Sequence, residues 1–429
     1  MEDKQALIPA TIATPPPGTL VTLGLFFLGN GEAIRRLAAM PRLWLVGLLM
    51  TFSAGLAREY DAEYLLAEPW HLLTAPLASW AAATILWILI HLYGIGRWEQ
   101  RPAWLTSYRT FLGLFWLTAP LAWLYGIPYE RFMSPGDAAV SNLWTLALVA
   151  CWRVIIIIRV QQALFTIPFF QATITTLVFS DGLMLLALSM IPIPIFALMG
   201  GVKLGAADQV LASFAFLSQA LGYLALMILL PIWLFLCFLR GARWRMQLPM
   251  PSLSIKPIVI LALAGIGWWC SWLPIAQPEQ QLRWRTESAL QAGDFASGLK
   301  LLNENAADQY PPHWDAPPRN GFSPPQPDPA EVLLYLIDHP MGPRLQEFYE
   351  KKFLALILSG RYFRNQKPIT SEKRIAILER SPDASRLLYA QISETQLYVE
   401  LKNRYDSEKD PVLKKRLGDL LMRYPKPQP

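Results

Sequence analysis

The chain has little charge and few reactive side chains for its length. Only 16% of its 429 residues are charged, against about 25% in an ordinary soluble domain. It has four histidines and three cysteines. It shows no Gly-rich phosphate-binding loop and no Ser or Cys nucleophile in a recognisable elbow. The common signatures of nucleotide-binding proteins and hydrolases are therefore excluded, and no catalytic residue or cofactor is predicted.

Cysteine and excess positive charge are also too scarce to indicate a function. The three cysteines lie in apolar runs without zinc or disulfide spacing, which predicts small buried hydrophobes: Cys151, Cys237 and Cys270. The part of the chain after Pro274 holds 22 basic and 20 acidic residues. Such a balance is nearly neutral and argues against a nucleic-acid partner.

What the chain does have is a series of long apolar runs, which end near Pro274. Bilayer hydrocarbon is about 30 Å thick, so a spanning helix needs roughly 20 apolar residues. Candidate spans lie near 43–57, 72–95, 110–127, 143–164, 171–195, 210–239 and 257–273. The first is short, and segment 19–28 is too short to span and is expected at the interface. The expected fold class is all-α: a polytopic transmembrane helix bundle of about seven spans, followed by a soluble α-helical domain.

Basic residues in the loops predict the orientation of these spans. Twelve Lys and Arg residues fall in the N-terminal segment and in alternate loops, whereas the opposite loops hold only Arg58, Arg131 and Lys203. Because cytoplasmic loops carry the excess of Lys and Arg, the N-terminus is expected in the cytoplasm of a cell with the bundle in its inner membrane. Seven spans then place the C-terminal domain on the outer side, and losing the first span would reverse that.

Two charged residues lie in the middle of apolar runs, where a charge costs at least about 2.5–3.5 kcal/mol. Arg153 and Asp181 are each 14 positions from Ile167, at the apparent turn between their spans. Antiparallel neighbours would hold both side chains at the same depth. We therefore expect an intramembrane ion pair, which serves either as a structural clamp or as part of a solute or proton path.

An acidic loop follows the first predicted span. It contains Glu59, Asp61, Glu63, Glu68 and His71. Glu68 and His71 are i, i+3 neighbours, and a carboxylate with an imidazole at this spacing can bind a divalent metal. The alternative is an anion-rich external loop in which Trp70 and His71 anchor the chain at the lipid headgroups. Both interpretations stay open.

The sequence after the last span predicts helices only. The expected order is an N-terminal segment (1–42), the bundle (43–273), a helical hairpin (274–310), a Pro-rich linker (311–329) and a C-terminal helical domain (330–429). The hairpin turns at Gly293-Asp294 and resembles one tetratricopeptide unit. Asp328-Pro329 and Asp410-Pro411 have the cap-plus-proline pattern that begins a helix, and His339-Pro340 ends one.

Two stretches carry a resemblance to a known group of proteins. AREYDAEYLLAEPWHLLTAPLAS (57–79) and SPGDAAVSNLWTLALVACWRV (134–154) resemble an uncharacterised family of bacterial multi-pass membrane proteins, and PPHWDAPPR (311–319) resembles part of the same family. Residues 70–190 are also similar in layout to Yip1-type membrane domains, which are five-span bundles linked to membrane organisation. The resemblance implies a membrane bundle with a helical C-terminal domain and no particular activity.

The first functional hypothesis is a membrane-anchored interaction or scaffold protein of the cell envelope. Its partners would be the lipid bilayer and a protein bound by the C-terminal helical domain. The alternative is a small-solute or ion transporter that uses Arg153 and Asp181. A membrane-embedded enzyme built on the acidic loop is the third hypothesis.

Overall fold

The structure is a computed structural model. It describes residues 17–99, 102–189, 206–238, 243–246, 248–249, 253–312, 314, 327, 329–350, 376–377, 379–380, 402–403 and 405–423. In these residues every regular element is a helix, apart from one isolated parallel bridge between Trp98 and Trp244. The expected all-α class is confirmed.

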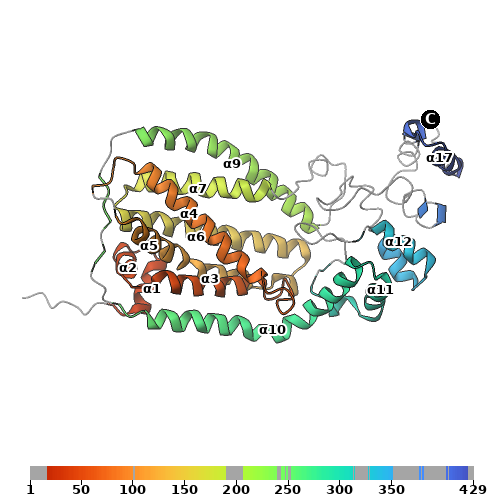
Figure 1. Ribbon diagram of the computed structural model, residues 1–429, viewed down its shortest axis with the longest axis horizontal. Coiled ribbons are helices and arrows are strands. Elements are labelled where there is room, and N and C mark those ends of the chain that lie inside the picture. Colours follow the sequence, from red (N-terminus) through yellow and green to blue (C-terminus); the bar gives the residue numbers. More distant parts are fainter. Residues whose placement is uncertain are drawn as a thin grey trace, which may run out of the picture.

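Long helices lie side by side in an elongated bundle (Figure 1). They are α3 (Leu43–Glu59), α4 (His71–Tyr93), α5 (Trp104–Trp116), α6 (Pro135–Phe165), α7 (Phe169–Ser189), α9 (Ala206–Phe238) and α10 (Lys256–Gln291). The short 3-10 helices η1 (Ala119–Gly126) and η2 (Tyr129–Arg131) extend α5. Among the described residues, six helical segments are long and apolar enough to cross a membrane, and α3 is not one of them on its own.

Helix α3 lies in the interior of the bundle. It packs against α4, α5, η1 and α10. It approaches α5 closely because both helices have a glycine at the contact: a Cβ on Gly47 would lie 2.8 Å from the Trp116 Cβ, and one on Gly113 would lie 2.9 Å from the Trp44 nitrogen. Because its neighbours enclose it, α3 does not have to be as long as the hydrocarbon layer of a bilayer is thick.

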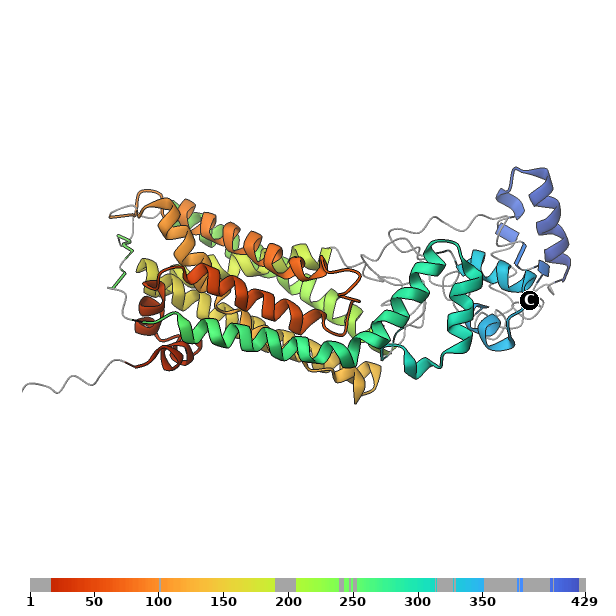
Figure 2. The ribbon, with the colours of Figure 1, turned by 60° about the horizontal axis from the view of Figure 1, so that its bottom comes forward.

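The first predicted span is present as α3, which is too short to count as a span by itself. Helix α3 has 17 residues, about 25 Å. It passes as a span only together with α2 (Gly31–Ala38), from which it is bent by 110°. Helix α2 contacts α6, and α1 (Thr19–Phe27), the segment expected at the interface, contacts α2 and α10. These two short helices cap one end of the bundle (Figure 2).

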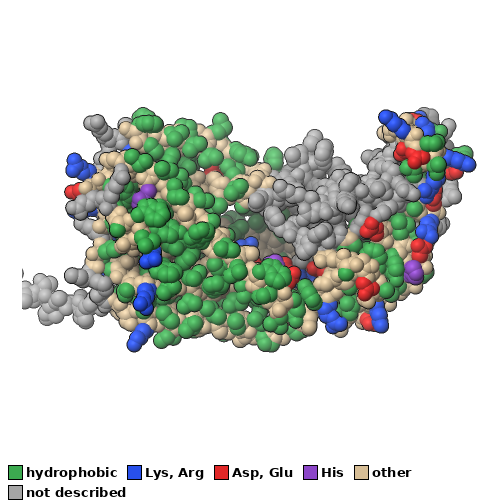
Figure 3. Space-filling view, viewed as in Figure 1, with side chains coloured by type: hydrophobic (Ala, Val, Ile, Leu, Met, Phe, Trp, Pro, Cys, Tyr) green, Lys and Arg blue, Asp and Glu red, His purple; other side chains and the backbone are tan. Residues whose placement is uncertain are grey.

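The face of the bundle that Figure 3 shows is largely apolar. Helix α9 has large hydrophobic side chains turned outward, such as Met227 and Phe235, which are 74% and 62% exposed. Cys151 and Cys270 are also exposed rather than buried, which corrects the expectation from their apolar surroundings. Apolar runs pointed to burial, but in this bundle much of the apolar surface faces outward. A soluble monomer rarely exposes so large a continuous apolar area.

Helix α10 runs without interruption from the bundle into the C-terminal part of the chain (Figure 2). It has 36 residues and contains Pro274 and Pro278. The domain boundary expected between residues 273 and 274 thus falls inside a helix. The end of α10 packs on α11 (Phe295–Glu304). Their buried core, which includes residues after α11, contains Leu290, Leu299, Leu302, Tyr310, Ala330, Val332, Leu333, Leu336, Leu345, Tyr349 and Ile377.

Local signals in the C-terminal part correctly predicted several helix ends. Gly293 has a φ of +79° in the turn after α10, and the Asp294 carboxylate accepts from the Ser297 N–H at the start of α11. Helix α12 (Pro329–Asp338) ends before His339-Pro340, and α17 (Pro411–Arg423) begins after Asp410. Most of the linker 311–329, residues 190–195 of the fifth predicted span and much of 330–429 lie outside the described residues.

The two ends of the bundle differ in charge. At the end with α1, Thr19 donates to the Ser254 carbonyl and the Glu99 N–H donates to the Trp244 carbonyl. We call it the basic end because it carries Arg35, Arg36, Arg42, Arg97, Arg109, Arg159, Arg245 and Lys256. The opposite, acidic end carries Glu59, Asp61, Glu63, Glu68, Glu130 and Glu279 together with the outward half of α10.

Candidate functional site at the acidic end

The two charges in the middle of the bundle contact different helices. Arg153 on α6 donates to the Ser79 hydroxyl of α4 at 3.5 Å and lies over the Phe115 ring, 4.5 Å from its centroid. Asp181 on α7 lies beside Gly222 of α9, where a Cβ would be 3.0 Å from the Asp181 Oδ1.

The expected ion pair between Arg153 and Asp181 is not formed. The Arg153 Nε and the Asp181 Oδ2 have no hydrogen-bond partner among the described residues. Equal distance from a turn fixes the depth of two residues. The direction of each side chain depends on the rotation of its helix, about 100° per residue. The spacing in the sequence therefore predicted the depth and could not predict the contact.

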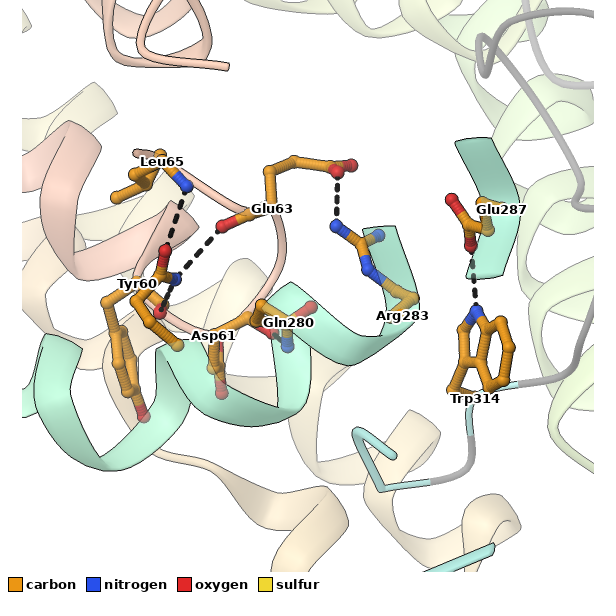
Figure 4. A network of polar contacts seen from close by, with 9 residues as sticks. Tyr60, Asp61, Glu63, Leu65, Gln280, Arg283, Glu287 and Trp314 are labelled. Atoms are coloured by element: carbon orange, nitrogen blue, oxygen red, sulfur yellow. Dashed lines mark hydrogen bonds and ion pairs between the residues drawn. The ribbon is translucent and has the colours of Figure 1, made fainter. Parts of the chain in front are cut away.

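The acidic loop, residues 60–70, lies against α10 (Figure 4). Gln277 of α10 makes three hydrogen bonds to the loop backbone. Its Nε2 donates to the carbonyls of Tyr60 and Glu63, each at 3.1 Å, and its Oε1 accepts from the Leu65 N–H at 2.9 Å. One turn further along, Gln280 donates to the Asp61 carbonyl. Turns within the loop satisfy some of its backbone groups, such as the Ala67 N–H, which donates to the Tyr64 carbonyl. Side chains of α10 satisfy others, as buried polar groups require.

An ion pair holds the same loop to the next turn of α10. The Arg283 Nη2 lies 2.7 Å from the Glu63 Oε2, and their side chains are 2% and 22% exposed. The Nε and Nη1 of Arg283 have no hydrogen-bond partner among the described residues. Removing one member of such a pair strands a poorly hydrated charge. This contact makes Arg283 and Glu63 dependent on each other.

A second polar group joins the loop to η2 and α10. Arg131 donates to both carboxylate oxygens of Glu279, at 3.2 and 3.0 Å. Burial raises the pKa of the nearby Asp61 carboxyl to about 6, the negative charge of Glu130 adds to this effect, and Arg131 opposes it. The Asp61 side chain thus lies near Glu130 and Arg131 and points away from that of Glu63 (Figure 4).

Three of the five residues proposed as metal ligands come together. Glu63, Glu68 and His71 each place a ligand atom within 4.8 Å of the others. Glu59 is close enough to be influenced electrostatically by Glu63 and His71, whereas its close ion-pair contact is with Arg58 at 3.7 Å. Asp61 is held apart, as described above. The group at the start of α4 is thus smaller than the five residues suggested by the sequence.

Several charged groups act on the Glu68 carboxyl. Burial raises its pKa, and the like charge of Glu63 raises it further. Glu287 also raises the pKa of Glu68, whereas His71 and Arg283 lower it. Carboxylates and positively charged groups therefore lie close together at the start of α4.

Helix α10 also connects this site to the C-terminal helices. The Trp314 indole N–H donates to the Glu287 Oε1 at 2.9 Å, one turn beyond Arg283. Trp314 stacks on Tyr310, with ring centroids 4.5 Å apart, and the Tyr310 hydroxyl hydrogen-bonds Thr286. Successive turns of α10 therefore hold the acidic loop and then the residues after α11.

The contribution of α10 could not be seen from the sequence. Gln277, Gln280 and Arg283 are more than 210 positions from their partners in the loop. They occur where the apolar run ends, in a segment that resembled the first helix of a separate hairpin. The one signal in the sequence was the spacing of these three polar residues, which are three positions apart and so lie near one face of a helix.

Comparisons of the chain with protein-family models, with curated proteins and with solved structures find no match. The resemblance to bacterial multi-pass membrane proteins stays a prediction.

Proposed function

We propose that this chain is a membrane-anchored interaction protein, in which the bundle lies in a lipid bilayer and α10 carries a helical domain out of it to a protein partner. Among the described residues, the acidic end holds no recognisable grouping of nucleophile, base and oxyanion donors. Helical hairpins with a buried core and exposed charged faces are suited to binding other proteins.

The observation that carries this proposal is the length and continuity of α10. Its 36 residues extend about 54 Å, well beyond the roughly 30 Å of bilayer hydrocarbon. The part before Pro274 is apolar and packs on α3, and the last turns carry Gln277, Gln280 and Arg283 and pack on α11. One continuous helix thus joins a lipid-facing part to a water-facing part.

The exposed side chains of the bundle support the first half of the proposal. Apolar residues cover the outside of α9, and the charged residues gather at the two ends (Figure 3). A lipid bilayer around the bundle would keep this apolar surface out of contact with water. We further propose that the basic end faces the cytoplasm, following the positive-inside rule. The acidic end and the C-terminal helices would then lie on the outer side of the cell's inner membrane.

The test is capture of partners by the full-length protein and by a chain that ends at Ala292. The shortened chain keeps the bundle and all of α10, and it lacks α11 and the C-terminal helices. An interaction protein should lose one or more specifically captured proteins on this deletion while its level in the membrane is unchanged. Identical partners from both chains would contradict the proposal.

If the chain is a transporter instead, the deletion should have the opposite effect. Transport through the bundle should survive the same deletion and should fail on charge reversal at Arg153 or Asp181. These two residues contact different helices, so no paired route of charges between them supports this function. Solute uptake that is lost in Asp181→Lys and kept in the chain ending at Ala292 would favour the transporter over the interaction protein.

A further inference from the structure

The group of Glu63, Glu68 and His71 has features of an incomplete coordination site. Two carboxylates and one imidazole come from the middle of the loop, its end and the first residue of α4. On a tetrahedral Zn²⁺ with bonds of about 2.0–2.2 Å, neighbouring ligand atoms are roughly 3.4 Å apart. The present separations, all within 4.8 Å, would close to roughly 3.4 Å, a movement that side-chain rotation can supply.

Two of these three side chains are available to a ligand. The carboxylate of Glu68 and the imidazole of His71 have no hydrogen-bond or ion-pair partner among the described residues, although the His71 ring lies near that of Trp70. Glu63 accepts from Arg283 through Oε2. A carboxylate has about four lone-pair sites, so Glu63 can keep this contact and also coordinate an ion.

The ligand types of the group favour a divalent transition metal. Two carboxylates and one imidazole place their ligand atoms close together. A dication would offset the repulsion between the carboxylates of Glu63 and Glu68. Imidazole with carboxylates suits borderline transition metals such as Zn²⁺ better than Mg²⁺ or Ca²⁺, which prefer oxygen ligands alone.

We propose that Glu63, Glu68 and His71 form a divalent transition-metal site, with Zn²⁺ as the best-fitting ion, at the point where the acidic loop meets α4 and α10. Three protein ligands leave a fourth position for water. Through the contact of Glu63 with Arg283, a bound ion would be connected to the helix that leads to the C-terminal domain. The proposal does not depend on which partner that domain binds.

The experiment is titration of the chelator-treated, detergent-purified full-length protein with Zn²⁺, followed by calorimetry and by elemental analysis after dialysis. One Zn²⁺ per chain is expected. Glu68→Gln and His71→Ala should each weaken binding at least about tenfold, in line with the loss of a ligand contact. Glu304→Gln and His339→Ala make the same chemical changes on the C-terminal helices and should leave binding unchanged.

Several outcomes would overturn the proposal. They are the absence of bound Zn²⁺, equal binding by the Glu68→Gln, His71→Ala double variant, and equal losses in the two control variants. Binding of Ca²⁺ in preference to Zn²⁺, lost in Glu68→Gln and kept in His71→Ala, would remove the imidazole and contradict the site as proposed.

A measurement on the unmodified protein covers the case in which a variant does not fold. Co²⁺ added to the chelator-treated protein should give a visible ligand-field spectrum that Zn²⁺ then abolishes. A spectrum no different from that of Co²⁺ in buffer would contradict a protein-bound site.

Discussion

Asp61 lies between Tyr60, Glu130 and Arg131, where little water reaches its carboxyl. Burial raises its pKa from 3.8 to about 6. Between these values the folded protein keeps a proton that the unfolded chain has lost. The free energy of unfolding therefore falls as pH rises from about 4 to about 6, and the loss persists at higher pH.

Replacing Asp61 with Asn should remove this penalty. We expect Asp61→Asn to be more stable than the original protein by up to about 2 kcal/mol near pH 7.5 and no different at about pH 2.5, where the carboxyl is protonated in both states. Thermal unfolding in detergent at the two pH values checks this. Asp308→Asn, at an exposed acid, is the control, and a destabilised Asp61→Asn at pH 7.5 would contradict the assigned environment.

The pair of Arg283 and Glu63 predicts non-additive mutations. Arg283→Met alone should destabilise the protein by about 3 kcal/mol, because it removes the guanidinium that pairs with the half-buried Glu63 carboxylate. Adding Glu63→Gln should restore part of that loss. A double-mutant cycle in thermal or denaturant unfolding measures the coupling, and the exposed Lys300–Glu304 pair should give less than about 0.5 kcal/mol. Additive effects at Arg283 and Glu63 would contradict a coupled pair.

At the scale of helices, the close approach of α3 and α5 depends on a glycine. A Cβ on Gly113 would meet the backbone of α3 at 2.9 Å, whereas one on Gly267, within α10, would meet nothing within 4 Å. Gly113→Ala should therefore cost about 1–3 kcal/mol by pushing the helices apart. Gly267→Ala should be neutral or stabilise by up to about 1 kcal/mol, through helix propensity. Melting temperatures of the two variants make the comparison, and equal shifts would contradict the close packing.

The sequence predicted helix positions better than helix environments. Apolar run length located the long helices, and Asp294 and Asp410 marked the starts of α11 and α17. Run length could not show that α3 is enclosed by its neighbours, because an enclosed helix and a lipid-facing helix are equally apolar. It also divided α10 at residue 273, since the change from apolar to polar residues resembles a domain boundary even when the backbone continues.

The sequence predicted the residues that the acidic loop and the start of α4 contribute to the candidate site, and it did not predict those of α10. Local spacing identified Glu63, Glu68 and His71, which the structure brings together. Gln277, Gln280 and Arg283 could not be assigned to them, because contacts between residues so distant in the chain depend on how the whole bundle is assembled. The predicted contact of Arg153 with Asp181 failed for the same reason.

At the scale of the molecule, the arrangement predicts which parts are accessible from each side of a membrane. The basic end and the C-terminal helices lie at opposite ends of the bundle (Figure 1). We expect a phosphatase fused after Pro429 to be active outside the cytoplasm, and a fluorescent reporter at the same place to stay dark there. The reverse pattern would contradict the proposed orientation.

Insertion in the bilayer is a separate expectation. Alkaline carbonate should not release the protein from membranes, because it removes proteins that are bound only at the surface.

Helix α10 is weakest where the loop holds it. Pro274 and Pro278 have no N–H, so the carbonyls of Cys270 and Pro274 lose their partners within the helix and bending is easiest there. Gln277, Gln280 and Arg283 contact the loop beside this segment, and these contacts restrict the bending of α10. A force on the C-terminal helices would thus act on residues 60–70 as well as on α10, and weaker contacts to that loop would make bending at Pro274 and Pro278 easier.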